Sequence, residues 1–175
     1  MKKYILVFLL LPAMIFSCNN KEGNTNMAAT DSSNIQLPFK AKYTVAANNN
    51  VSDSDLLLVM NSYKYWENGD AKGLRSTMGD SMSVNGATGF TFNGPTDSVM
   101  KYWQLSRDSL SSVKIRMAVW TKNQIVGNSN HFINVWYNEI DTYKSGKIDS
   151  ANYEDDNAVK NGKIVWFSSH KQILK

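Results

Sequence analysis

The stretch from Asp55 to Asp70 predicts a long helix that is apolar on more than one side. Its large apolar side chains recur at intervals of three and four residues, as on one face of a helix: Leu56, Val59, Met60, Tyr63 and Trp66. Leu57, Leu58 and Tyr65 widen this stripe. A helix of this kind needs a surface that wraps around it, and the strand-rich second half of the chain can supply that surface.

Capping residues and turn residues divide the chain around this helix. Three N-cap candidates precede it, Ser52, Asp53 and Ser54, and Gly69 marks its expected end. A short second helix is expected over Ala71 to Met78, ended by Gly79 and Asp80. A third helix is expected after Asn93-Gly94-Pro95, with Thr96 as its N-cap.

From Val113 the hydrophobic period changes from that of a helix to that of a strand. Alternation assigns four side chains to one face, Val113, Ile115, Met117 and Val119, and four to the other, Lys114, Arg116, Ala118 and Trp120. Further strands are expected over 81–84, 131–140, 153–159 and 164–174, with turns at Asn85-Gly86 and Asn161-Gly162 and a polar loop over 142–150. Helices followed by an antiparallel meander predict an α+β fold with helices on one face of a curved sheet.

The N-terminus reads as a secretory signal that ends in a lipidation site. Lys2 and Lys3 precede an apolar run that is too short to cross a membrane. The run ends at Ile15-Phe16-Ser17-Cys18, which resembles the lipobox of bacterial lipoproteins and makes Cys18 the expected lipidated residue. The alternative is an ordinary cleaved signal that leaves a free thiol. Lipidation predicts attachment to the membrane of a bacterial cell envelope, on the periplasmic or outer-surface side.

Three segments follow from this interpretation: a signal peptide over 1–17, the lipidated cysteine and a flexible tether over 18–37, and one domain over 38–175. The tether has few large apolar residues, so it cannot offset the entropy of ordering. Removal of the signal lowers the formal charge from +4 to +2 because two lysines leave with it. No run of Lys or Arg remains, so a nucleic-acid partner is not expected.

Several short motifs together resemble a known fold family. These are Tyr63-x-x-Trp66-x-x-Gly69-Asp70, the Asn93-Gly94-Pro95 helix start with Trp103 after it, and the Asn161-Gly162-Lys163-Ile164-Val165 hairpin. In this order and spacing they resemble the SnoaL-like members of the nuclear transport factor 2-like (NTF2-like) superfamily. With the lipobox, the chain resembles the SnoaL-like lipoproteins of Bacteroidetes-type bacteria. The resemblance implies a cone in which a curved antiparallel sheet wraps a long first helix beside two shorter ones, and it implies frequent dimerisation through the outer sheet face.

The same resemblance bears on chemistry, because the family includes isomerases, cyclases and dehydratases of apolar small molecules. A steroid-isomerase-like member needs an Asp base, a Tyr on the first helix and a late-strand Asp. The base position falls near Asn85-Gly86, where no carboxylate stands, and the Tyr position falls at Ser62. These departures favour binding of an apolar small molecule over catalysis. The alternatives are an isomerase, cyclase or lyase that uses an inward Asp, and a dimerisation module without enzymatic activity.

Asp155 and Asp156 are the candidate acids, since the resemblance leaves the late-strand Asp at one of them. Adjacent strand residues point to opposite faces, and the face shared by Tyr153, Asp155 and Asn157 is the more apolar. Asp155 is therefore expected to point inward as a general acid or hydrogen-bond donor, unless both acids are solvated at a strand end. The candidate pocket residues are Ser62, Tyr63, Trp103, Asn134 and Trp136, of which the aromatic ones fit a core or a dimer interface equally well.

Metal and cofactor chemistry finds no support in the sequence. His131 and His170 are the only histidines, and neither has a second histidine or a cysteine nearby to complete a zinc site. The chain has neither a phosphate-binding P-loop nor a glycine-rich dinucleotide motif. We therefore expect no metal and no cofactor, with a small molecule, the membrane and a second copy of the chain as the possible partners.

Overall fold

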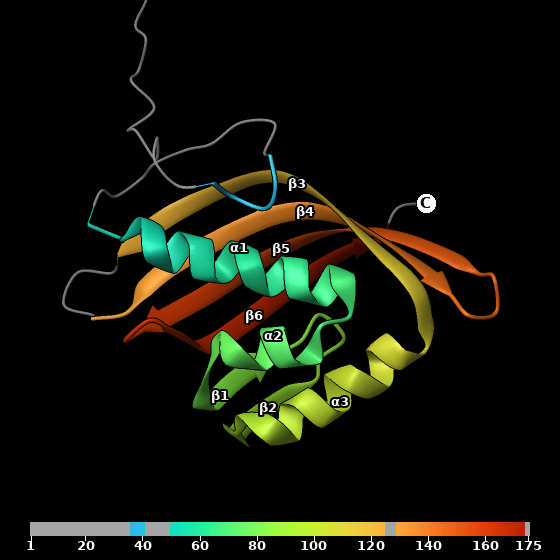
Figure 1. Ribbon diagram of the computed structural model, residues 1–175, viewed down its shortest axis with the longest axis horizontal. Helices are drawn as coiled ribbons and strands as arrows, with labels where there is room; N and C mark the ends of the chain where they lie inside the picture. The colour runs from blue at the N-terminus through green and yellow to red at the C-terminus, as the bar shows by residue number, and fades with distance from the viewer. Residues whose placement is uncertain (1–35, 41–49, 125–128, 174–175) are drawn as a thin grey trace, which may run out of the picture.

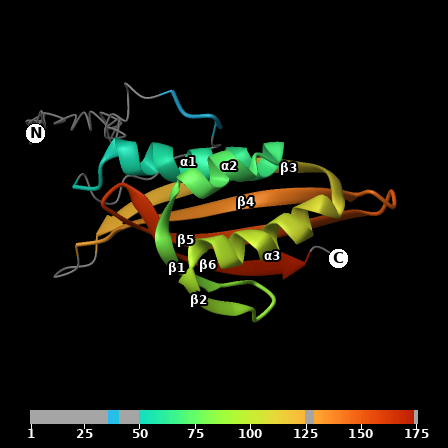
Figure 2. The ribbon, with the colours of Figure 1, turned by 60° about the horizontal axis from the view of Figure 1, so that its bottom comes forward.

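The computed structural model describes residues 36–40, 50–124 and 129–173. Three helices lie on one face of a curved six-stranded sheet, so the α+β class is confirmed (Figures 1 and 2). The strand order is β2-β1-β6-β5-β4-β3. The elements are α1 (Asp53–Asn68), α2 (Ala71–Ser76), β1 (Met78–Asn85), β2 (Thr91–Pro95), α3 (Thr96–Asp108), β3 (Leu110–Gln124), β4 (His131–Tyr143), β5 (Ile148–Lys160) and β6 (Lys163–Ile173).

Helix α1 begins and ends where its capping residues predict. The Ser52 hydroxyl accepts the backbone N–H of Asp55 at 3.1 Å, and Gly69 ends the helix in the left-handed conformation with φ 72°. The expected stripe is buried at four of its five positions, Leu56, Val59, Met60 and Tyr63, while Trp66 is half-buried. The helix packs on the face of the sheet that we call the inner face (Figure 1).

Polar side chains of α1 fix its position over β3. Glu67 accepts the backbone N–H of Ile115 on β3 at 3.0 Å. At the other end of the helix, Lys122 of β3 pairs with Asp53 at 2.9 Å. Because these contacts hold both ends of α1, the side chains on its buried face meet the sheet in one register.

Strand β3 contains a bulge that overturns the alternation expected from the sequence. The pairing with β4 shifts between Met117 and Val119, so one extra residue is inserted there. The insertion turns Trp120 to the inner face, where it is 6% exposed, whereas Val119 is half-buried on the outer face. The expectation that Trp120 lies opposite Met117 is therefore wrong.

The sheet also differs from the expected antiparallel meander. Strand β1 pairs in parallel with β6, so the sheet is mixed. Strand β1 begins at Met78, which shortens α2, and β2 was not expected at all. Thr96 does not cap α3, because its hydroxyl donates to the carbonyl oxygen of Gly79 at 2.5 Å and Pro95 holds the N-cap position.

Strands β4 and β5 extend into the segment that the sequence assigned to a polar loop. The connection between them is only the turn from Lys144 to Lys147, and Gly146 takes a left-handed φ of 86° there. The turn at Asn161-Gly162 is confirmed, with φ values of 52° and 66°. No helix in the described part of the chain is both long and apolar enough to cross a membrane.

Candidate functional site

Asp155 of β5 lies completely buried between α1 and the sheet, so it points inward. Tyr63 of α1 and Tyr137 of β4 donate their hydroxyls to the same carboxylate oxygen, Oδ2, at 2.9 and 2.8 Å. Asn157 donates its side-chain amide to the Tyr63 hydroxyl at 3.1 Å. Among the described residues, the other carboxylate oxygen, Oδ1, accepts no hydrogen bond of normal geometry, although the Ser169 hydroxyl on β6 lies close enough to lower the pKa of this carboxyl. A buried polar atom without a well-formed hydrogen bond is uncommon, and sites that bind ligands are one place where it occurs.

Burial sets the protonation of this group. Burial raises the pKa of Asp155 to about 6, while the hydroxyls of Ser169, Tyr137 and Tyr63 oppose the rise. Burial, together with the charge of Asp155, also raises the pKa of both tyrosines well above 10. Tyr63 and Tyr137 therefore remain hydrogen-bond donors across the physiological range.

A second buried carboxyl, Glu139 of β4, extends this polar interior toward the C-terminal end of α1. The indole Nε1 of Trp66 donates to Glu139 Oε2 at 3.2 Å. Burial first, and then repulsion by Asp141 and Asp155, raises the pKa of Glu139 to about 8. Glu139 is thus mostly protonated at neutral pH and can donate or accept a proton.

Sequence reasoning missed Glu139, although a signal for it exists. The inward positions of β4 follow strict alternation, Ile133, Val135, Tyr137 and then Glu139. An acidic residue at the next position of a buried apolar series is unusual, because burying an ionised carboxyl is costly.

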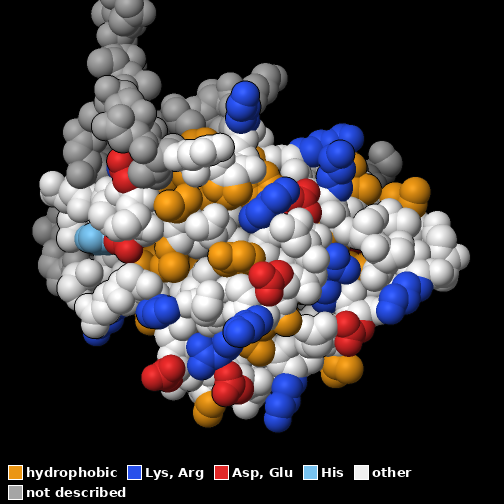
Figure 3. Space-filling view, in the orientation of Figure 1, with side chains coloured by type: hydrophobic (Ala, Val, Ile, Leu, Met, Phe, Trp, Pro, Cys, Tyr) orange, Lys and Arg blue, Asp and Glu red, His pale blue; other side chains and the backbone are white. Residues whose placement is uncertain are grey.

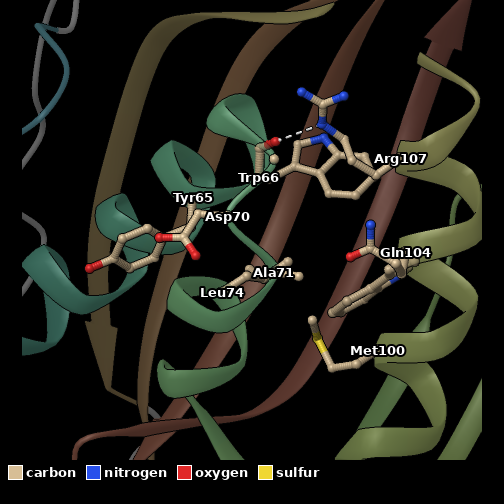
Figure 4. A pocket seen from close by; sticks show the side chains of 10 residues that line it. Tyr65, Trp66, Asp70, Ala71, Leu74, Met100, Gln104 and Arg107 are labelled. Atoms are coloured by element: carbon tan, nitrogen blue, oxygen red, sulfur yellow. Dashed lines mark hydrogen bonds between the residues drawn. The ribbon is translucent and has the colours of Figure 1, made fainter. Parts of the chain in front are cut away.

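A groove opens beside Trp66, between α2 and α3. Figure 4 shows Met100 of α3 facing Leu74 of α2 across it, with Trp66 and Arg107 side by side at one end. The groove has a volume of about 10 Å³, roughly the space that one water molecule needs, so a larger ligand would have to displace side chains. Trp66 lines this groove and also donates to Glu139, so its indole ring separates the groove from that carboxyl.

Three of the candidates lie on the other face of the sheet. Asn134, Trp136 and Asp156 point to the outer face, where Asn134 contacts both Asp156 and Thr121 through hydrogen bonds. Alternation explains this, because the neighbours Val135 and Asp155 are the inward residues. Asn134 and Trp136, which the sequence offers as pocket residues, therefore lie on the opposite face of the sheet from Asp155.

The remaining candidates take different positions. The hydroxyl of Ser62 is buried but donates to the carbonyl oxygen of Val59 at 2.7 Å, within its own helix. Trp103 is half-buried at the groove, and its ring packs edge-to-face with that of Phe167, the centroids lying 5.9 Å apart. Cys18 lies outside the described residues, as do the segment expected to be a signal peptide and most of the segment expected to be a tether.

Comparison with solved structures settles the fold. No family model and no curated protein matches this chain in sequence. A dehydratase candidate of the NTF2-like family from Streptomyces avermitilis superposes with a TM-score of 0.59 at 12% identity, over 71% of this chain and all of that one. An epoxide hydrolase from M. tuberculosis superposes with a TM-score of 0.56 at 8% identity, over 68% of this chain and 83% of that one. The chain has the NTF2-like fold.

A third NTF2-like structure, a protein of unknown function from Exiguobacterium, matches with a TM-score of 0.54 at 14% identity, over 66% of this chain and 98% of that one. At such identities the likeness concerns the fold alone. Within its own NTF2-like fold this chain has exposed Asn85 at the end of β1, where the family resemblance places an acidic base. The buried acids of the chain come instead from β4 and β5.

Proposed function

We propose that this NTF2-like chain is a lipid-anchored envelope protein that binds a small molecule with an apolar body and one polar group. The apolar body enters the groove lined by Leu74, Met100 and Trp103 by displacing side chains, and movement of Trp66 lets the polar group approach the buried carboxyls. Lipidation of Cys18 supplies the anchor. The proposal is consistent with solved structures of the same fold described as a hydrolase and a dehydratase candidate.

One observation carries the proposal: the fully buried carboxyl of Asp155, whose Oδ1 atom accepts no hydrogen bond of normal geometry among the described residues. Leaving such an oxygen unpaired costs about 1–3 kcal/mol, which a ligand donor recovers on binding. Catalysis is the weaker candidate, because exposed Asn85 cannot act as a base and Asp155 lies behind two tyrosines.

The groove can be tested with matched substitutions on α2 and α3. Lipophilic ketones and alcohols are titrated into the full-length protein while tryptophan fluorescence is recorded, since Trp66 and Trp103 border the groove. Met100→Arg fills the groove with charge and is expected to abolish binding. Leu105→Arg is the control on the same helix, because Leu105 is 72% exposed and does not line the groove.

Asp155→Asn tests the polar end of the same site. The variant keeps the shape of the side chain and is expected to weaken binding about tenfold, the cost of one charged hydrogen bond. Equal affinity in Met100→Arg, Leu105→Arg and the unmodified protein would refute the groove as the binding site. For the anchor, Cys18→Ser is expected to move the protein from the membrane fraction to the soluble fraction.

Dimerisation through the outer sheet face is the second candidate. This face carries no helix among the described residues (Figures 1 and 2). Three half-buried aromatic side chains lie on it, Phe132, Trp136 and Trp166. Light scattering on the full-length protein in detergent measures the mass. Trp136→Glu is expected to convert a dimer to a monomer, and a monomeric unmodified protein would refute this candidate.

A further inference from the structure

Among the described residues, polar side chains on the outer face of the sheet join into two rows, which we call the amide rows. The first row crosses β3, β4 and β5. The Thr121 hydroxyl donates to Asn134 Oδ1 at 3.2 Å, and the side-chain amide of Asn123 donates to both of these residues. Asn134 donates in turn to Asp156. Because each side chain is held by a neighbour, the row has its shape before any ligand binds.

The second amide row crosses β4, β5 and β6. The side-chain amide of Asn138 donates to the Ser150 hydroxyl at 3.1 Å and to Asn152 Oδ1 at 3.3 Å, and Asn152 donates to Gln172 at 3.5 Å. Asn134 and Asn138 are four residues apart on β4, so the rows lie about 13 Å from each other along the strand. Every member of both rows is half-buried or exposed, so a ligand in solvent can reach them.

Aromatic rings flank the amide rows. Trp136 lies on β4 between Asn134 and Asn138, and thus between the two rows. Phe132 and Trp166 lie on the other side of the first row, where their rings pack edge to face with centroids 6.4 Å apart. The outward side chains of β4 over 132–138 therefore alternate between an aromatic ring and an amide. The three aromatic side chains are half-buried, so part of each ring is open to solvent.

Charges around the amide rows balance each other. Glu154 and Asp156 on β5 are acidic, Lys114 and Arg116 on β3 are basic, and all four lie on the outer face. A nucleic acid or another polyanion needs a continuous positive surface, which these side chains do not provide. A second copy of the chain would bury the rows, whereas the centre of a homodimer interface is usually apolar. The face therefore suits a neutral, polar partner that forms hydrogen bonds with the rows.

Sugars have the chemistry that aromatic rings and amides in this arrangement can recognise. A pyranose ring presents C–H groups on its flat faces, and these pack against the electronegative face of an aromatic ring. Its rim carries hydroxyls that donate and accept hydrogen bonds, as side-chain amides also do. In a β-1,4-linked glucose chain every sugar keeps flat faces and an equatorial rim of hydroxyls, so an extended chain can contact aromatic rings and amides in turn.

We propose that the outer sheet face binds an extended, neutral β-1,4-linked glycan. Its sugars stack on Trp136 and on the Phe132–Trp166 pair, and its hydroxyls form hydrogen bonds with the amide rows. This site lies on the opposite face of the sheet from the groove between α2 and α3, so it is independent of the ligand proposed above. Glycan binding and self-association through the outer face exclude each other.

The test titrates cellohexaose into the full-length protein and follows the indole N–H signals of the tryptophans by NMR. Maltohexaose is the comparison probe, because it contains the same sugar in α-1,4 linkage and coils instead of extending. We expect cellohexaose to shift the Trp136 and Trp166 signals with saturation and to leave Trp66 and Trp103 unshifted, since these two border the groove. Maltohexaose should bind about fivefold more weakly.

Matched variants separate stacking from hydrogen bonding. Trp136→Ala is expected to weaken cellohexaose binding about tenfold, while Trp136→Phe keeps an aromatic ring and should retain most of the affinity. Tyr102→Ala is the control for loss of an aromatic side chain, because Tyr102 is 46% exposed on α3. Asn138→Ala breaks the second amide row and is expected to weaken binding about fivefold. Asn68→Ala, which removes an exposed amide at the end of α1, should leave binding unchanged.

Cellohexaose binding can fail in three ways, and each overturns the proposal. Absence of a saturable shift would do so, and a dimer that Trp136→Glu dissociates would then give the outer face to a second copy of the chain. Shifts confined to Trp66 and Trp103 would place the sugar at the groove. Equal affinity for the two hexasaccharides, or full affinity in Trp136→Ala, would exclude stacking on the outer face. Failure of the lipophilic ketones and alcohols would leave the glycan site intact, because Trp66 and Trp103 report on the groove.

Discussion

The hydroxyl of Tyr63 lies 2.9 Å from Oδ2 of Asp155, although 92 residues separate them in the sequence. This contact joins α1 to β5, and Tyr137 adds a donor from β4 at the same oxygen. The position of the helix, the sheet register and the ionisation of one buried carboxyl are therefore coupled. A change at any of the three groups should be measurable in the stability of the fold.

The stability of the protein should fall as the pH rises from about 4 to about 6. The pKa of Asp155 is about 6 in the folded state and about 4 in an unfolded chain, so the folded state binds this proton more tightly. The stabilising proton is fully bound below pH 4 and is lost as the pH passes 6. The two-unit difference corresponds to about 3 kcal/mol in the free energy of unfolding. Urea unfolding of the unmodified protein and Asp155→Asn at several pH values measures it.

Asp155→Asn is the variant whose pH dependence can contradict this prediction. Asp155→Asn has no proton to lose in this range, so its stability should fall less between pH 4 and 6 than that of the unmodified protein. Parallel curves for the two proteins would show that Asp155 does not titrate differently on folding. Glu139→Gln should also flatten the curve, but over a wider range that reaches about pH 8, because the pKa of Glu139 is raised from its ordinary value of 4.5 to about 8 in the folded state.

Removal of the Tyr63 hydroxyl should destabilise the protein by about 1–3 kcal/mol. Tyr63→Phe keeps the ring but takes one donor from Asp155 Oδ2 and one acceptor from Asn157, and both partners are buried. Loss of the donor should also raise the pKa of Asp155 further. Thermal unfolding measures the first effect, with Tyr65→Phe on the same helix as the control. If both variants unfold at the same temperature, the buried hydroxyl contributes nothing to stability.

Sequence patterns sufficed for α1 and for the inward direction of Asp155, because both depend on local rules. Ser52 and Gly69 are capping residues whose chemistry acts within one turn, and the strand period decides between Asp155 and its neighbour. The strand period also places Asn134 and Trp136 on one face, but it does not say whether that face is inward, because an aromatic or amide side chain is compatible with either face of a sheet.

The remaining features depend on partners far away in the chain. The parallel pairing of β1 with β6 joins residues near 80 to residues near 166, and no local pattern carries that information. Glu139 can be recognised as a site residue only in the three-dimensional structure, where Trp66 donates to it and the charges of Asp141 and Asp155 act on it. A single sequence does not give the pKa shift that follows from such burial.

The bulge in β3 predicts unequal costs for substitutions at two nearby positions. Trp120→Ala should destabilise the protein by about 3–5 kcal/mol, because it opens a cavity on the inner face where Trp120 is 6% exposed. Val119→Ala should cost less than about 1.5 kcal/mol, since Val119 is half-buried on the outer face. Urea unfolding of the two variants measures both values. A larger loss at Val119 would mean that strict alternation holds through this strand.

Arg107 should stabilise the C-terminal end of α1 by capping it from another helix. Its Nε and Nη2 atoms donate to the carbonyl oxygens of Trp66 and Glu67, each at 3.1 Å. The Trp66 carbonyl oxygen also accepts the backbone N–H of Gly69 at 3.0 Å, and a cation beside the last carbonyls interacts favourably with the negative end of the helix dipole. Arg107→Ala should therefore cost about 1–2 kcal/mol in the free energy of unfolding.

The Arg107→Lys variant separates charge from geometry at the same position. A lysine keeps the positive charge but lacks the planar fork that spans two carbonyls, so it should recover only part of the loss. Lys101→Ala, an exposed cation on α3, serves as the control and should change stability by less than about 0.5 kcal/mol. Hydrogen exchange at the amides of 66–70 reports the end of α1 directly. Unchanged exchange there in Arg107→Ala would show that Gly69 alone ends the helix and that Arg107 contributes nothing to its cap.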